Sequence, residues 1–204
     1  MKNRVLLSAI LALLFSSGCS NAQTMGDKKI LIVYLSRTNN TKTIAEIIQR
    51  NVGGKLVALE LQKPYPENYK QTVQQVVDEN ANGYLPQLKT KIDSIEQYDV
   101  VFIGFPTWDM QMPPPMKSFL HEYDLSGKIV IPFNTNAGYG VGSGFRTVRA
   151  LCKNSKVLDG VSITGGIERD GVLFVMKGDK LKEVENEVQE WLRKIEKFAI
   201  QKLF

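Results

Sequence analysis

The sequence predicts one α/β domain built on a parallel sheet. Apolar, strand-like runs alternate with amphipathic, helix-like segments, which is the pattern of βαβ units. One of these runs, 100–104, is continuously apolar, as expected for a parallel strand that is covered on both faces. The chain of 204 residues shows no internal repeat and no linker, and its length suits one domain with a sizeable core.

The first half of the chain predicts two strands and two helices. An apolar run at 30–35 precedes a helix over 41–52, which two glycines end. Residues 55–61 alternate between apolar and polar, as an edge strand does. A second helix is predicted to end near Gly83, and 85–98 is expected to be partly helical. The apolar positions of this second helix are Tyr69, Val73, Val76 and Val77.

Three more strands are predicted at 100–104, 128–133 and 157–163. Pro132 is unusual inside one of them, because proline cannot donate a hydrogen bond to a neighbouring strand. The loop 105–115 and the glycine-rich loop that follows the fourth strand each lead into a helix.

The end of the chain predicts one long helix. Residues 165–176 are expected to form a loop or a small hairpin. Asp179 is expected to cap an amphipathic helix whose apolar positions lie on one stripe. The folded domain therefore occupies 28–204.

Residues 1–22 have the pattern of an export signal. Two basic residues precede an apolar run over 5–15, which is too short to span a bilayer, and small residues follow it. The sequence Ser-Ser-Gly-Cys resembles a bacterial lipobox, which predicts a lipidated Cys19 and a lipoprotein of the cell envelope. Cleavage after Ala22, which releases a soluble exported protein, is the alternative.

Charge and cysteine content exclude several classes of protein. Residues 1–18 contain two basic and no acidic residues, so their removal lowers the formal net charge from +5 to +3. This balance is too mild for a nucleic-acid partner. Cys19 and Cys152 are the only cysteines, which excludes a disulfide framework and a cysteine-based metal site. Any membrane association is expected to depend on the lipid anchor alone.

Polar side chains crowd the point at which the first strand ends and the first helix begins. A helix start offers unpaired N–H groups and the positive end of the helix dipole, both of which favour an anion. One helix cap needs one such side chain, but five lie within six positions. These residues are Ser36, Thr38, Asn39, Asn40 and Thr41.

Other phosphate-binding motifs lack their characteristic residues here. A Walker loop needs Gly-Lys-Ser/Thr, a dinucleotide loop needs glycines in its first turn, and a loop-type phosphatase needs a cysteine. Glu60 lies where an acid that binds ribose would sit, so the dinucleotide reading stays open. A single terminal phosphate held by hydroxyl groups fits best.

The sequence SRTNNT resembles the phosphate loop of flavodoxins, whose pattern Ser/Thr-x-Thr-x-x-Thr is matched by Ser36, Thr38 and Thr41. GFPTWDMQMPPP resembles their second flavin loop, with Trp108 placed to stack on the flavin. FNTNAGYGVGSG stands at the position of the third loop, in which Tyr139 could meet the other edge of the ring. All three loops follow predicted strands, where open α/β sheets bind their ligands.

The resemblance implies a flavodoxin-like fold with strand order 2-1-3-4-5 and helices on both faces. It also implies non-covalently bound FMN, with no catalytic residue and no metal. The implied cofactor-binding residues are Ser36, Arg37, Thr38, Asn39, Asn40, Thr41, Pro106, Thr107, Trp108, Asp109, Asn134, Thr135, Asn136, Gly138 and Tyr139.

The resemblance favours electron transfer through the flavin, to a redox protein or a small-molecule acceptor. Flavodoxins are strongly acidic whereas this chain is mildly basic, so their partners do not carry over. Asp109 also stands where flavodoxins often have glycine. Two alternatives are an FMN-dependent NAD(P)H:quinone-type reductase and an envelope binding protein that has lost flavin.

Overall fold

Six parallel strands form one sheet in the computed structural model, which describes residues 28–201. The strands are β1 (Ile30–Tyr34), β2 (Lys55–Ala58), β3 (Val100–Pro106), β4 (Ile129–Asn136), β5 (Lys156–Val157) and β6 (Val161–Thr164). The helices are α1 (Asn40–Val52), α2 (Tyr69–Asn82), α3 (Pro114–Glu122), α4 (Gly144–Leu151) and α5 (Gly178–Gln201), with short 3₁₀ turns η2 (Ile95–Gln97) and η3 (Glu168–Asp170). The predicted signal peptide, Cys19 and residues 202–204 lie outside the described part of the chain.

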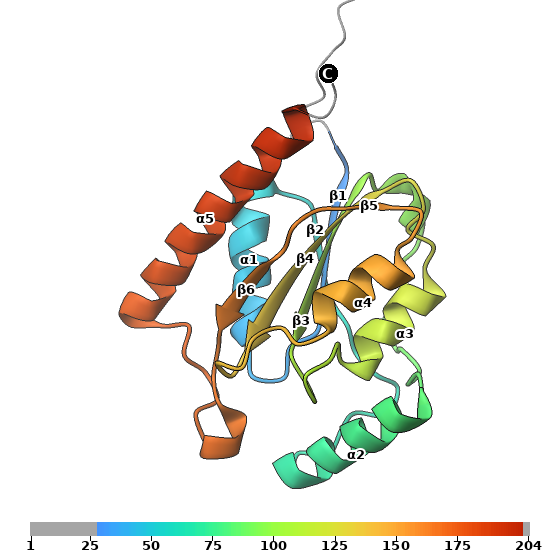
Figure 1. Ribbon diagram of the computed structural model, residues 1–204, viewed down its shortest axis with the longest axis vertical. Coiled ribbons are helices and arrows are strands. Elements are labelled where there is room, and N and C mark those ends of the chain that lie inside the picture. The colour runs from blue at the N-terminus through green and yellow to red at the C-terminus, as the bar shows by residue number, and fades with distance from the viewer. Residues whose placement is uncertain (1–27, 202–204) are drawn as a thin grey trace, which may run out of the picture.

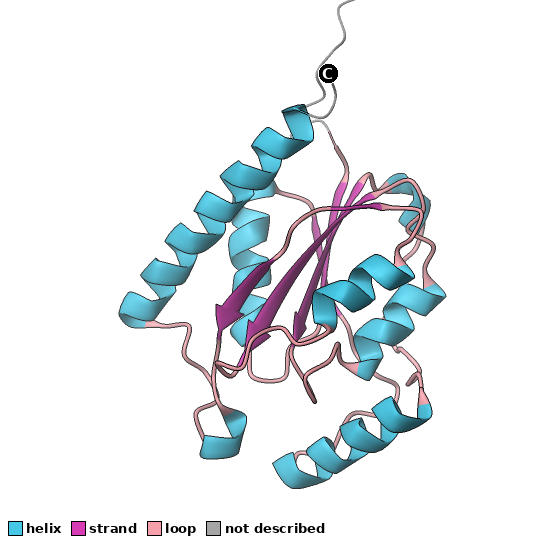
Figure 2. Cartoon of the chain, viewed as in Figure 1, coloured by secondary structure: helices cyan, strands magenta, loops and turns pink. Residues whose placement is uncertain are grey.

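The strand order β2-β1-β3-β4-β5 confirms the predicted order. Helices α1 and α5 cover one face of the sheet, and α3 and α4 cover the other (Figure 1). Figure 2 shows the strands enclosed between these two helical layers. In β1, Ile30 and Ile32 belong to the core under α1 and α5, whereas Leu31 and Val33 belong to the opposite core. Burial on both faces explains why this strand is apolar throughout.

The predicted fifth strand is divided, so the expected number of five strands is wrong by one. Both β5 and β6 pair with β4, and Leu158 to Gly160 separate them. The Val130 carbonyl faces this side, where it accepts a 2.9 Å hydrogen bond from the Leu158 N–H. Backbone polar groups two residues apart point to the same neighbouring strand, so the backbone of Pro132 also faces the gap between β5 and β6. The N–H that proline lacks would have no strand partner there, and no hydrogen bond of the sheet is lost.

Helix α2 stands away from the two main layers, beside the carboxyl ends of the strands (Figure 1). Of its predicted apolar positions only Val76 is buried, whereas Tyr69, Val73 and Val77 are 36–41% exposed. Residues 85–98, which were expected to be partly helical, contain the turn η2 as their only helical element, and Leu88 forms an isolated β-bridge with Leu61.

Helix α5 begins at Gly178, so Asp179 lies in its first turn instead of capping it. The stripe of Val184, Val188 and Trp191 is buried against the sheet, and the Trp191 indole N–H donates to the Asp159 carbonyl at 3.0 Å. Within residues 28–201, the helices include none that combines the length and apolarity needed to cross a bilayer.

Candidate functional site

The loops that follow β1, β3, β4 and β6 lie together at the carboxyl edge of the sheet (Figure 1). Residues of these loops line a cleft. Its main part has a volume of about 330 Å³ and adjoins a smaller cavity of about 120 Å³. The two parts form one site, because several residues line both. These shared residues are Arg37, Tyr69, Thr107, Trp108, Asn136, Ala137 and Glu168.

Residues 38–41, at the start of α1, lie beside the smaller cavity and leave their backbone N–H groups available; we call this group of N–H donors the nest. Asn39, at φ 62°, turns the chain into the helix. Among the hydrogen bonds of the described residues, none uses the N–H groups of residues 38–41. Unpaired donors and the positive end of the helix dipole thus face the same place, which favours a negatively charged group.

Two hydroxyl groups lie next to this nest in the chain, and of the two only Thr38 lines the smaller cavity. Ser36 Oγ accepts from the Lys42 N–H at 3.2 Å, and Thr38 Oγ1 accepts from Asn40 Nδ2 at 2.8 Å. Because both oxygens act as acceptors within the chain, each hydroxyl keeps its own hydrogen for a bound anion.

Three other predicted ligands line the site, but the fold uses their polar groups. The Arg37 guanidinium donates to Glu168 Oε1 at 2.7 Å and to the carbonyls of Pro66 and Glu67 at 3.0 and 2.7 Å. Asn40 donates to the Leu173 carbonyl at 2.6 Å. Thr41, which is 2% exposed, shares a 2.8 Å hydrogen bond with Thr135, and the donor is either hydroxyl. Arg37 and Asn40 therefore hold neighbouring loops against the nest.

The second loop contains a two-residue turn between Trp108 and Gln111. Each of these residues donates its N–H to the carbonyl of the other, at 3.1 and 2.8 Å. The central residues, Asp109 and Met110, have φ values of 49° and 51°, the pattern of a type I′ turn, which prefers Asn-Gly. A left-handed conformation at a residue such as Met costs roughly 1–2 kcal/mol. This turn therefore needs support from the rest of the fold.

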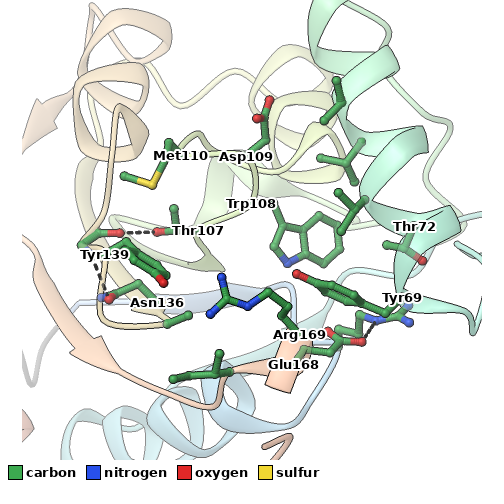
Figure 3. A pocket seen from close by; sticks show the side chains of 17 residues that line it. Tyr69, Thr72, Thr107, Trp108, Asp109, Met110, Asn136, Tyr139, Glu168 and Arg169 are labelled. Atoms are coloured by element: carbon green, nitrogen blue, oxygen red, sulfur yellow. Dashed lines mark hydrogen bonds and ion pairs between the residues drawn. The ribbon is translucent and has the colours of Figure 1, made fainter. Parts of the chain in front are cut away.

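Side chains of α2 and α3 supply part of that support. The Asp109 carboxylate accepts from Asn80 Nδ2 at 3.1 Å and from Gln111 Nε2 at 3.2 Å. The Lys117 ammonium donates to Asn80 Oδ1 at 2.8 Å and to Gln111 Oε1 at 3.2 Å. Burial lowers the pKa of Lys117, while Asp109 acts in the opposite direction. Asp109 extends to the opposite side of the loop from the Trp108 indole (Figure 3).

The third loop is held in shape by its own asparagine side chains. Asn136 Oδ1 accepts from the N–H groups of Gly138 and Gly140 at 2.8 and 3.0 Å. Asn134, which is fully buried, donates to the Phe105 carbonyl at 2.8 Å and so ties β4 to β3. Tyr139, at the tip of the loop, is 64% exposed and points toward the cleft (Figure 3).

The second and third loops also touch each other. The Ser143 N–H donates to the Met110 carbonyl at 2.9 Å. Gly142 has φ 57°, and a Cβ at this position would overlap the Met110 carbonyl oxygen. This close approach requires glycine for two reasons, its conformation and its lack of a side chain.

Two walls of the cleft were not among the predicted site residues. One is the apolar face of α2, with Tyr69, Val73, Val76 and Val77. The other is the segment Ile167, Glu168 and Arg169. The signal for the first wall was present as the apolar stripe of α2, but the sequence predicts only that such a stripe is covered and not by what.

Arg169 extends into the cleft between Trp108 and Tyr139 (Figure 3). Its guanidinium makes a bidentate contact with Asp170, at 2.8 and 3.2 Å. Asp170 and the Tyr139 hydroxyl both raise the pKa of Arg169 and so stabilise its charge. The side chain is 60% exposed, so its charge is accessible from the cleft and from solvent.

The complete site combines an anion nest with an aromatic slot. A ligand that suits both parts has a terminal phosphate, a polar chain and a flat ring system. The nest would hold the phosphate, while Trp108 and Tyr139 offer faces on which a ring can stack.

Comparison with known proteins assigns the family. The family model described as Flavodoxin matches residues 29–177, so this chain belongs to the flavodoxin family. A flavodoxin from Synechocystis sp. is 28% identical over 127 residues, which cover 60% of this chain. This chain spans 61% of the length of that curated relative.

Solved structures support the same assignment. A candidate flavoprotein from Bacteroides eggerthii is 27% identical, with a TM-score of 0.65, and the match covers 82% of this chain and 98% of that one. A flavoprotein from Lactobacillus acidophilus, solved in complex with FMN, is 25% identical with a TM-score of 0.58. That match covers 67% of this chain and 93% of the relative.

Proposed function

We propose that this protein binds FMN non-covalently in the cleft and transfers electrons through it. The observation that carries the proposal is the group of unpaired N–H donors at residues 38–41, directly beside a slot lined by Trp108 and Tyr139. The FMN complex of the Lactobacillus acidophilus relative supports the choice of cofactor. FMN itself supplies the one- and two-electron chemistry when it is bound.

The residues of the site fit FMN part by part. The nest and the hydroxyls of Ser36 and Thr38 would hold the phosphate. The Thr107 N–H already donates to the Thr135 carbonyl at 2.8 Å, which fixes the second loop against β4 between the two parts of the site. Trp108 and Tyr139 would stack on the ring and exclude water from its faces.

The electron acceptor would be either a redox protein or a small molecule. The apolar wall formed by Tyr69, Val73 and Val77 favours the second candidate function, a reductase that acts on an apolar ring such as a quinone. Rapid oxidation of NADH or NADPH by the purified protein, with a quinone as acceptor, would identify this activity. An electron carrier would instead show slow turnover and rapid exchange with a redox protein.

Export to the cell envelope is part of the proposal and rests on the sequence of residues 1–22. Strand β1 begins at the opposite edge of the sheet from the cleft (Figure 1). A lipid anchor at Cys19 would therefore attach the domain at the edge remote from the cleft and leave the cleft open to a partner. In this case Cys19→Ser should release the protein from the membrane fraction, whereas a protein that stays in the cytoplasm contradicts export.

One absorbance spectrum and one titration test the central claim. The purified mature protein should show a flavin spectrum, or should acquire one when it is mixed with FMN. It should bind FMN more tightly than riboflavin, because riboflavin lacks the phosphate. A colourless protein that binds neither ligand would contradict the proposal and would favour a binding protein that has lost flavin.

A further inference from the structure

We propose that the last turn of α2 positions Trp108 for stacking on the cofactor, with Tyr65 and Asn80 as the positioning residues. The inference rests on the proposed FMN site, but it concerns side chains outside the flavodoxin-like loops. The two residues act on opposite sides of the same turn: Tyr65 on the indole of Trp108, and Asn80 on the neighbouring Asp109.

Tyr65 fixes the orientation of the indole. Its ring meets Trp108 edge to face, with centroids 5.4 Å apart and an interplanar angle of 86°. This is a favoured geometry for aromatic pairs, because the positive edge of one ring faces the negative face of the other. The contact with Tyr65 thus sets the orientation of the Trp108 ring before a ligand enters the cleft.

Tyr65 is itself held by α2. Its hydroxyl donates a short hydrogen bond to Glu79, and the other Glu79 oxygen accepts from Gln75 at 2.8 Å. Glu79 is only 7% exposed, so this carboxylate has few alternatives to the two donors. Burial and the bond to Glu79 raise the pKa of Tyr65, which keeps the hydroxyl protonated as a donor.

Asn80, the next residue of α2, holds the other side of the turn. It donates to Asp109 Oδ2 at 3.1 Å and accepts from Lys117 at 2.8 Å. Asp109 and Met110 have positive φ values that neither residue favours by itself, so the turn depends on such external contacts. Two successive residues of α2 therefore define both the backbone after Trp108 and the plane of its ring.

Cofactor binding to four variants tests this role. Tyr65→Ala and Asn80→Ala should each weaken FMN and riboflavin to the same extent, by roughly three- to tenfold. Tyr65→Phe keeps the edge-to-face contact but loses the hydrogen bond to Glu79, so its affinity should fall between those of the unmutated protein and Tyr65→Ala. Gln74→Ala is the matched control, because Gln74 lies exposed on α2 and, among the described residues, its side chain hydrogen-bonds only to Asp78 of the same helix. Equal losses in the control, or none in the first two variants, would overturn the proposal.

A measurement without cofactor separates this proposal from the proposed function. The chain has two tryptophans, so protein labelled with 5-fluorotryptophan should give two ¹⁹F resonances, which Trp108→Phe assigns. In the protein without FMN, Tyr65→Ala and Asn80→Ala should shift or broaden the Trp108 resonance and leave Trp191 unchanged. An unchanged Trp108 resonance overturns the positioning role. If the resonance responds but the unmutated protein binds no FMN, positioning of the indole stands and the proposed function fails.

Discussion

The first and second loops of the site are built in different ways. The first loop, residues 36–41, offers its own backbone N–H groups at the start of α1, and these groups need no side chain from elsewhere to be presented. The second loop presents one large side chain, Trp108, on a turn with two unfavourable φ values. Contacts from α2, α3 and the third loop hold that turn in place.

This difference separates the two tasks of the site. A helix start recognises charge with local geometry alone, so a short sequence pattern is enough to specify it. An aromatic side chain that stacks on the flavin must lie at the correct distance and angle from the phosphate site, and only the surrounding fold can set that distance and angle. Changes near the first loop should thus affect phosphate recognition alone, whereas changes near the second should affect every flavin.

Gly142→Ala should have the largest effect, because it breaks the contact between the second and third loops. The substitution adds positive-φ strain and an overlap with the Met110 carbonyl, so we expect a loss of about 3 kcal/mol in the free energy of unfolding. Urea denaturation of the protein without cofactor measures this. Gly138→Ala is the control: its φ is also positive, at 90°, but nothing lies within 4 Å of the added Cβ. Equal losses in both variants would show that the overlap does not matter.

Thr38→Ala should weaken the first loop alone. Loss of one charge-assisted hydrogen bond should lower FMN affinity by roughly 1.5–3 kcal/mol and leave riboflavin affinity unchanged. Fluorescence titration with both ligands checks the result. Thr43→Ala is the control: it removes a hydroxyl in the first turn of α1 that, among the described residues, bonds only to the Asn39 carbonyl, so it should change neither affinity. A parallel loss of riboflavin binding would place the phosphate elsewhere.

Trp108→Ala should weaken FMN and riboflavin equally, by about 1.5 kcal/mol, since stacking does not depend on the phosphate. Bound flavin should be nearly non-fluorescent in the unmutated protein, because an indole in contact quenches its emission, and brighter in the variant. Strong emission from the unmutated complex would contradict contact between the indole and the ring.

Asp109→Asn should have the smallest effect on the cofactor. The carboxylate extends away from Trp108 and accepts from Asn80 and Gln111, so its charge is partly compensated. We expect the midpoint potential of bound FMN to change less than it does in Trp108→Ala. Spectroscopic titration against a redox dye measures both. A larger shift in Asp109→Asn would mean that the carboxylate turns toward the ring when FMN binds.

Several differences between expectation and structure share one cause. The fifth strand was expected to be continuous, but the chain leaves the sheet after Val157 and returns at Val161. The apolar positions of α2 predicted a helix but not its neighbour, and in the structure all four of them line the cleft. In both cases the local pattern reports which side chains avoid water and does not report which surface covers them.

The sequence by itself determined the parallel α/β fold, the strand order through the family resemblance, and the three loops that meet at the carboxyl edge. Apolar periodicity and the polar cluster at 36–41 are local signals, so no distant contact was needed to interpret them. Only the tertiary structure decided that Arg37 and Asn40 tie loops together, that α2 walls the cleft, and that Asn80 holds Asp109. These roles depend on contacts between residues far apart in the chain, which a linear pattern does not encode.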